Sequence, residues 1–172
     1  MADKYRCHVV KYADDACAFA EPFWQMQDEG LDGVVMYDSA QPNIVDWNSV
    51  TNSNMAWLIR IEDAQGNMVA IAWVNSFMGR CAMIHFCVFK AGRFNAVAIG
   101  RTLLGFVFKS GKLDALMGIT PATYRHALSF VEKLGFVRRM VLPKACHIVR
   151  KARYVDGIVT LLQRDDFMKG GD

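Results

Sequence analysis

The stretch Met83–Gly105, MIHFCVFKAGRFNAVAIGRTLLG, changes from strand-like to helix-like spacing of its apolar residues. Met83–Phe89 is rich in β-branched and aromatic residues, which is typical of a short strand. Apolar residues then recur three to four positions apart, which predicts a helix from about Ala98 to Lys109 with one buried face. Small and basic residues between them, Lys90–Asn95, predict a loop.

A strand that enters a helix through such a loop can hold an anion. The first turn of a helix has N–H groups without intrahelical acceptors, and the helix dipole adds positive potential. Arg93 and Arg101 would supply full charges for a phosphate. An ordinary strand-to-helix connection without a ligand is the alternative, and this stretch alone does not separate the two.

Length and composition predict one folded domain, residues 1–172. Hydrophobic residues make up 53% and charged residues 22%, and the formal charge is only +3 without a run of Lys or Arg, so we expect no nucleic-acid partner. The sequence has no apolar stretch of the ~18 residues that a membrane span needs, and we expect no membrane partner. Five cysteines without a C-x-x-C pair, and an N-terminus without a signal-peptide core, favour a reducing, cytoplasmic location.

The N-terminal half predicts a strand, a helix and a hairpin. Tyr5–Tyr12 alternates as a strand, and Ala13–Asp15 can cap a helix that ends near Gly30. The pattern is poor from Leu31 to Met55, where Asn43 or Asp46 could start a short helix. Two strands, Ala56–Ile61 and Met68–Val74, then flank a turn with Gly66 at its tip.

The C-terminal half predicts alternating strands and helices. Arg80–Phe89 continues the meander, and the strand Leu113–Ile119 follows the helix described first. Pro121 is expected to open a helix over Ala122–Leu134, which Gly135 ends. The last strands, Phe136–Leu142 and Arg153–Leu162, are expected to be joined by a basic loop. This order indicates an α+β fold with a mixed sheet.

Ala127–Phe136, ALSFVEKLGF, resembles the late motif of the GNAT N-acetyltransferases, N-x-x-A-x-x-x-Y-x-K-x-G-F. The expected order of elements is also similar to the order in that family. The general character of the sequence resembles that of acetyltransferase-like proteins of phages and prophages. The resemblance implies an α/β/α layered, GNAT-like acyl-CoA N-acyltransferase fold with a mixed, mostly antiparallel central sheet.

The resemblance also implies an activity. Members of the family transfer an acetyl group from acetyl-CoA to an amine of a small molecule or peptide by direct attack. A catalytically silent member that binds coenzyme A, or serves as an interaction module, is the alternative. A binder of similar fold that uses the cleft without the cofactor is a third possibility. Many members dimerise, and Trp73, Phe77, Met78 and the terminal strand offer apolar surface for a homodimer.

In this family a Q/R-x-x-G-x-G/A loop binds the cofactor's pyrophosphate, and two registers fit the chain. We prefer Asn95–Gly100, with Arg93 as a nearby phosphate partner; Arg93–Ala98 is the alternative. Both put Ala where the family's first Gly usually lies. The cofactor-binding residues expected from this loop are Arg93, Asn95, Ala96, Ala98, Ile99, Gly100 and Arg101.

The strand before the loop is expected to hold the pantetheine. In the family this strand parts from its parallel neighbour, so Cys87, Val88 and Phe89 would hydrogen-bond the pantetheine through the main chain. One of their amides would polarise the thioester carbonyl, as an oxyanion hole does.

The catalytic candidates are His85 and Tyr124. The resemblance places Val131 where the usual Tyr protonates the departing thiolate, and Tyr124 could offer its hydroxyl instead or simply pack. His85, with an ordinary pKa near 6.5, is the candidate general base, and a structural histidine is the alternative. Cys87 shares its face of the strand, but a Cys–His nucleophile pair would need a third group to orient it. The remaining histidines lack carboxylates at metal-ligand spacing, so we expect no metal.

The acceptor is not identified by the sequence. Acids among aromatic residues in the early helices suit a cationic amine, although a solvated acidic face is the alternative; these acids are Asp28, Glu29, Asp32, Asp38 and Asp46. The basic loop would meet an anionic acceptor or the cofactor's phosphates; it holds Lys144, His147, Arg150, Lys151 and Arg153.

Overall fold

The computed structural model describes residues 4–52 and 56–170, which form one seven-stranded sheet of order β1-β2-β3-β4-β5-β7-β6. Its strands are β1 Tyr5–Val10, β2 Trp57–Asp63, β3 Met68–Met78, β4 Cys81–Val88, β5 Ala115–Pro121, β6 Val137–Ile148 and β7 Arg153–Gln163. Neighbouring strands are antiparallel except β4 and β5, which are parallel. The predicted mixed, mostly antiparallel sheet is confirmed.

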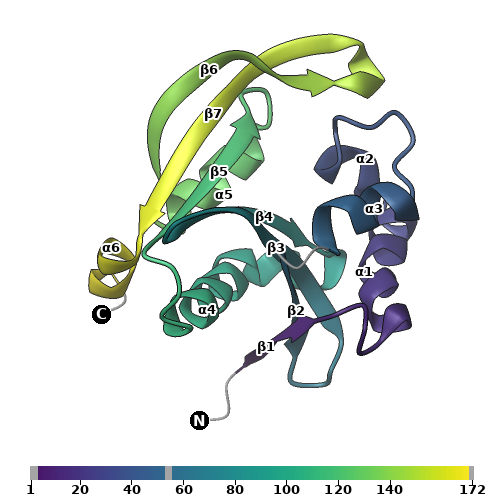
Figure 1. The fold of residues 1–172 in the computed structure, drawn as a ribbon, viewed down its shortest axis with the longest axis vertical. Coiled ribbons are helices and arrows are strands. Elements are labelled where there is room, and N and C mark those ends of the chain that lie inside the picture. The colour runs from purple at the N-terminus through teal and green to yellow at the C-terminus, as the bar shows by residue number, and fades with distance from the viewer. Residues whose placement is uncertain (1–3, 53–55, 171–172) are drawn as a thin grey trace.

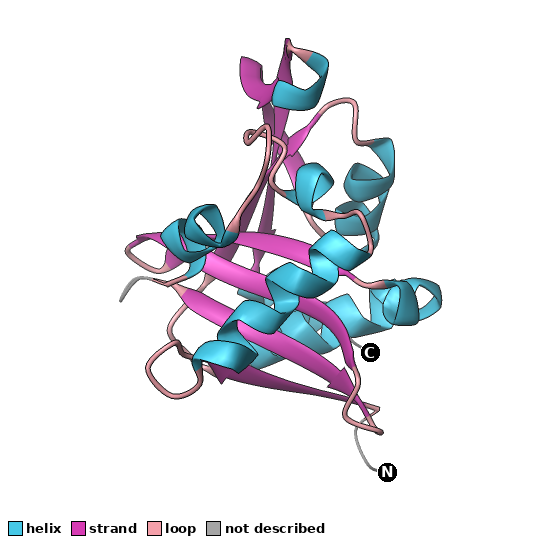
Figure 2. Ribbon diagram, turned by 90° about the vertical axis from the view of Figure 1, so that its right-hand side faces the viewer, coloured by secondary structure: helices cyan, strands magenta, loops and turns pink. Residues whose placement is uncertain are grey.

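Helices cover both faces of this sheet (Figures 1 and 2). The α-helices are α1 Ala16–Asp28, α2 Asp32–Val35, α3 Ile44–Thr51, α4 Ala96–Lys109, α5 Arg125–Lys133 and α6 Arg164–Lys169, with short 3₁₀ helices η1 Lys90–Asn95 and η2 Val149–Lys151. Residues of α1 and α3 share one apolar cluster with the sheet, and residues of α4 share the other. The predicted α/β/α layering is therefore confirmed.

The starts of the early helices follow the cap signals of the sequence. The Asp15 carboxylate accepts from the N–H groups of Cys17 and Ala18, both at 2.9 Å. Asn43 and Asp46 form a reciprocal capping box at the start of α3. Each cap satisfies N–H groups that a helix leaves open, which explains why these helices begin where they do.

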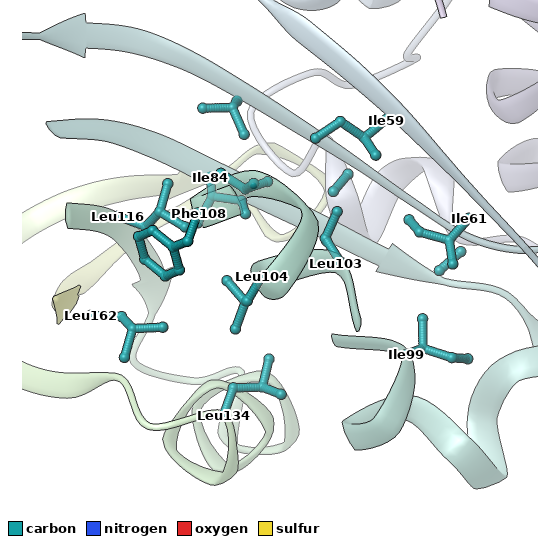
Figure 3. Packing of buried hydrophobic residues seen from close by; sticks show 14 of the residues in the cluster. Ile59, Ile61, Ile84, Ile99, Leu103, Leu104, Phe108, Leu116, Leu134 and Leu162 are labelled. Carbon is teal, nitrogen blue, oxygen red and sulfur yellow. The ribbon is translucent and has the colours of Figure 1, made fainter. Parts of the chain in front are cut away.

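The core lies on both sides of β2–β4. On one side, Leu103, Leu104 and Phe108 of α4 pack among strand residues (Figure 3). On the other side, Trp47 is fully buried, donates its indole N–H to the carbonyl of Phe19 at 3.1 Å and meets Trp73 edge-on. The segment with the poorest sequence pattern thus contributes a central core residue.

Several predicted boundaries are wrong. Pro121 ends β5 instead of opening a helix, and α5 begins only at Arg125. The α4 helix begins at Ala96, two residues earlier than predicted. Most of the expected basic loop is strand, because β6 continues to Ile148 through irregular pairing with β7 after Leu142. The sequence analysis also missed α6, whose Phe167 packs on Phe108.

The residues expected to form a homodimer surface are only partly exposed. Trp73 is 4% exposed because it packs under the early helices, and β7 lies between β5 and β6. Met78 is 53% exposed and Phe77 half-buried. Within the described residues, no helix combines the length and apolar character needed to cross a membrane.

Candidate active site

The parallel strands β4 and β5 part after three residue pairs. Cys81, Ala82 and Met83 pair with Ala115, Leu116 and Met117, and the described pairing ends there. Beyond this point β4 follows β3 and β5 follows β7. The divergence leaves a cleft of about 410 Å³ whose walls are Val34, Val35, Tyr37, Trp73, Ile84, His85, Phe86, Val88, Ala96, Gly118, Ile119, Thr120, Pro121, Tyr124, His126, Ala127, Phe130, Val131, Phe136 and Thr160.

The main chain of β4 alternates between β3 and the open edge. The Phe89 N–H donates to the carbonyl of Val69 in β3, at 3.0 Å. The Arg80 carbonyl instead accepts from the Asp114 N–H, on the β5 side, at 2.8 Å. Successive strand residues point their peptide groups to opposite edges. The peptide groups of Ile84, Phe86 and Val88 therefore face the cleft.

This alternation corrects the expected pantetheine contacts. Val88 presents its peptide groups to the cleft as expected. The alternation directs the peptide groups of Cys87 toward β3, and the N–H of Phe89 is already bonded to Val69. Phe86, which was not predicted, also directs its peptide groups to the open edge; which edge is open follows from the pairing of β4.

The floor of the cleft is apolar. Phe86 meets Phe130 of α5 edge-on, with ring centroids 5.6 Å apart. Val131 lies half-buried in the same wall, so the position of the motif's usual Tyr does face the cleft but carries no hydroxyl. This position therefore supplies no proton donor.

A second hollow of about 410 Å³ lies at the start of α4. Arg93, Phe94, Asn95, Ala96, Val97, Ala98, His126, Ser129, Phe130 and Lys133 line it. Ala96, His126 and Phe130 also line the first cleft, so the two hollows adjoin. Phe94 is wholly exposed there, and the sequence analysis missed Phe94, His126 and Lys133 as neighbours of the loop.

The position of the helix start bears on the two predicted loop registers. Val97 and Ala98 lie in the first turn of α4, directly after the 3₁₀ helix η1. The alternative register, Arg93–Ala98, covers this turn. Gly100 lies further along α4 and is buried; an added Cβ would come within 2.8 Å of Leu134, so Gly100 serves helix packing.

In the preferred register, Asn95–Gly100, the last residue thus lies outside the hollow. Ile99 is also buried in the core, and Arg101 lies on the helix without lining the hollow. Of the expected loop residues, Arg93, Asn95, Ala96 and Ala98 do line it.

His85 lies at the acceptor end of the cleft, opposite Trp73 of β3. The two rings stack with centroids 4.8 Å apart at 7°, and Nε2 lies 3.2 Å from Oδ1 of Asn75. Burial lowers the pKa of His85 to about 4, against a smaller opposing effect of Asp38. The expected pKa near 6.5 is therefore wrong.

Cys87 is not a nucleophile in this arrangement. It is buried in the core beneath the early helices, and burial raises the pKa of its thiol to about 12. A thiol with that pKa is almost wholly protonated at neutral pH. In the described residues, no cluster of three or more His, Cys, Asp or Glu side chains is placed to hold a metal.

Tyr124 precedes α5 as its N-cap instead of lying within it. Its ring meets Tyr37 edge-on at 5.9 Å, and both rings line the cleft. Burial raises the pKa of Tyr124, so its hydroxyl stays protonated. Tyr37 is engaged, because its hydroxyl donates to Sγ of Cys146 at 3.5 Å.

The tip of the β6–β7 hairpin lies on the same side of the molecule as α2 (Figure 1). The Val149 N–H donates to the carbonyl of Tyr37 at 3.0 Å, and Arg150 pairs with Asp32 at 3.2 Å. The basic and acidic groups that the sequence analysis treated separately thus neutralise each other at this contact.

Two other expected acids are also occupied. Glu29 accepts from the Lys90 N–H at 2.7 Å, and Asp46 caps α3. Asp38 is exposed, and its charge acts on His85.

No protein-family model and no curated protein matches this sequence. Solved structures do match its fold. The spermidine N-acetyltransferase of Vibrio cholerae in complex with CoA and spermine matches with a TM-score of 0.75 at 14% identity, over 96% of this chain and 98% of that one. A point mutant of that enzyme gives a TM-score of 0.74 at 16% identity, over 98% of this chain and 99% of that one.

The ribosomal-protein-S5-alanine acetyltransferase of Vibrio fischeri gives a TM-score of 0.69 at 14% identity, over 97% of each chain. The chain therefore has the GNAT acyltransferase fold.

Proposed function

We propose that this protein is an N-acetyltransferase that transfers the acetyl group of acetyl-CoA to an amine by direct attack. The observation that carries the proposal is the open edge of β4, whose cleft adjoins the hollow at the start of α4. A neighbour of the same fold binds CoA and spermine, as its description states, which supports the choice of cofactor.

The residues present fit coenzyme A. Phe86 and Val88 offer peptide groups to the pantetheine, and Val97 and Ala98 offer N–H groups to the pyrophosphate beside Arg93. Ala98 is exposed, so its methyl group does not fill the hollow. Phe94 offers an aromatic surface to the adenine, and Lys133 a charge to a phosphate.

Acetyl-CoA, when bound, supplies the thioester that the amine attacks. The new N–C bond forms as the C–S bond breaks, and the amine loses one proton. A peptide N–H of β4 donates to the thioester oxygen, where negative charge gathers in the transition state. His85 accepts the proton from the amine, since its lowered pKa keeps the ring unprotonated at neutral pH. Tyr124 donates its hydroxyl proton to the departing sulfur.

The acceptor carries one amine on an apolar body. Within the described chain, no Asp, Glu, Lys or Arg lines the cleft, and its acceptor end consists of Val34, Val35, Tyr37, Trp73 and Tyr124. Polyamines such as spermine carry several charges, each of which needs a partner. A matched amine panel, phenethylamine against spermidine, tests this preference through kcat/KM.

The central experiment measures binding and turnover separately. Acetyl-CoA should raise the melting temperature, because a ligand that binds only the folded state stabilises it. Thiol release with the amine panel then measures transfer. No shift of the melting temperature with millimolar acetyl-CoA would refute the cofactor assignment. Binding without turnover of any amine would favour a silent CoA-binding module. Val131 at the motif's Tyr position supports that alternative.

A single domain, a cytoplasmic location, a homodimer and likeness to phage-encoded proteins stay predictions from the sequence. Light scattering at tens of micromolar protein tests the homodimer, and a purely monomeric sample would exclude it under those conditions.

A further inference from the structure

Asn75 lies where β3 loses its regular pairing with β4. The register is regular up to the pair Asn75–Met83 and shifts before Met78. The next residue, Ser76, has a φ of 51°, a left-handed conformation that residues other than Gly rarely adopt. Bulges of this kind re-aim side chains next to active sites. Here the Asn75 side chain turns toward His85, two positions along the strand from the partner of Asn75.

The hydrogen bonds of Asn75 define which way its amide group points. Nδ2 donates to the carbonyl of Val50 at 3.4 Å, and a carbonyl can only accept. Oδ1 therefore faces His85 Nε2 at 3.2 Å, and it also accepts from the Ser76 hydroxyl at 3.3 Å. The reversed amide would set two oxygen atoms against each other at Val50.

An oxygen acceptor at Nε2 requires that this nitrogen carry the hydrogen. Neutral imidazole has one N–H, so Nδ1 is then the unprotonated atom. Among the described residues, Nδ1 has no hydrogen-bond partner. It is also not one of their polar side-chain atoms that are buried without a partner. The stack on Trp73 limits rotation of the ring, so both nitrogen atoms keep their directions.

We propose that Asn75 is a positioning residue that holds His85 in the Nε2–H tautomer and so leaves Nδ1 to accept the proton of the acceptor amine. The first half rests only on the hydrogen bonds of Asn75, and the second half rests on the proposed function. In the transfer, the amine nitrogen bonds to the acetyl carbon, its proton moves to Nδ1, and the sulfur leaves with the C–S electron pair.

The tautomer is measured directly by nitrogen-15 NMR of the histidine side chains, without cofactor or acceptor. The parent protein should show His85 with hydrogen on Nε2 and none on Nδ1. Asn75→Ala should give a mixture of tautomers, whereas Asn75→Asp should keep the Nε2–H form because its carboxylate also accepts. Met78→Ala is the matched control, because Met78 ends the same strand and its side chain is 53% exposed.

Turnover supplies the second measurement. Asn75→Ala should lower kcat by about tenfold or more, within the range of general-base effects, with an unchanged Kd for acetyl-CoA that also shows an intact fold. Met78→Ala should retain kcat. A parent with hydrogen on Nδ1, a tautomer that survives Asn75→Ala, or an unchanged kcat would each overturn the proposal. If the parent acetylates no amine, the proposed function fails, while the tautomer measurement still confirms or overturns the assignment to Asn75.

Discussion

The buried imidazole of His85 links folding to pH. In the unfolded chain it binds a proton below about pH 6.5, whereas in the folded protein it does so only near pH 4. Unfolding therefore takes up a proton between these values. The stabilising contribution is fully present above pH 6.5 and is lost as pH falls toward 4.

Replacement of His85 by Gln should remove this pH dependence. The difference in unfolding free energy between parent and variant should change by up to about 3 kcal/mol between pH 7 and pH 4, since one pKa unit corresponds to about 1.4 kcal/mol. Urea denaturation of both proteins at both pH values measures this difference. The same difference at pH 7 and at pH 4 would contradict the lowered pKa of His85. For the same reason we expect no ascending limb near pH 6.5 in the activity profile from His85.

Phe94 offers a test of where the cofactor's adenosine lies. Stacking of a base on an aromatic side chain contributes about 1–3 kcal/mol, so Phe94→Ala should raise the Kd of coenzyme A about tenfold. The Kd of phosphopantetheine, which lacks the adenosine, should not change. Phe106→Ala removes a partly exposed ring elsewhere on α4 and should leave both constants unaltered. Equal losses for both ligands would place the adenosine elsewhere.

At the scale of the elements, a negative charge can be added to the first turn of α4 without destabilising the helix. Ala98→Asp puts a carboxylate in the first turn, where it should stabilise the helix by about 0.3–1 kcal/mol. The same charge should repel the pyrophosphate and abolish the thermal shift with acetyl-CoA. Ala13→Asp, equally exposed in the turn before α1, should keep that shift. A full shift with Ala98→Asp would show that the phosphates bind elsewhere.

Two glycines of α4 should respond oppositely to a side chain. Gly100 faces Leu134 and Phe130 closely, whereas an added Cβ at Gly105 meets nothing within 4 Å. Gly100→Val should therefore lower the unfolding free energy by about 1–3 kcal/mol through overpacking. Gly105→Val should change it by about 0.5 kcal/mol or less, because helix propensity is then the main effect. Similar losses in chemical denaturation would refute the packing role of Gly100.

Across the molecule as a whole, the tip of the β6–β7 hairpin contacts α2, and α2 lines the cleft. Arg150 lies directly over Gly33, where a Cβ would come within 1.9 Å of the guanidinium carbon. Its partner Asp32 is 118 residues away in sequence. This contact joins the hairpin tip to α2, and neither residue lines the hollow at α4.

Loss of the contact should affect the acceptor and spare the cofactor. Arg150→Met should raise the acceptor KM roughly fivefold, the equivalent of about 1 kcal/mol, with an unchanged Kd for coenzyme A. Lys151→Met removes a neighbouring, exposed charge that forms no ion pair within the described chain, and should change neither. An unchanged KM for Arg150→Met would mean that the hairpin is not part of the acceptor site.

Local sequence predicts the order of the seven strands and of the longer helices, includes Asp15 and Asn43 among the candidate caps, and predicts the helix end at Gly135. These features depend on neighbours a few residues apart, so periodicity and side-chain chemistry report them directly. The same local signals predict the strand that opens toward the cofactor and the helix that follows it.

The way these parts act together comes from the tertiary structure. The peptide groups that face the cleft depend on where β4 leaves β5, and the loop register depends on where α4 begins. The pKa of His85 depends on burial beneath distant helices, and the Asp32–Arg150 pair joins opposite ends of the chain. Each of these properties arises from packing between segments remote in sequence, which local patterns do not encode.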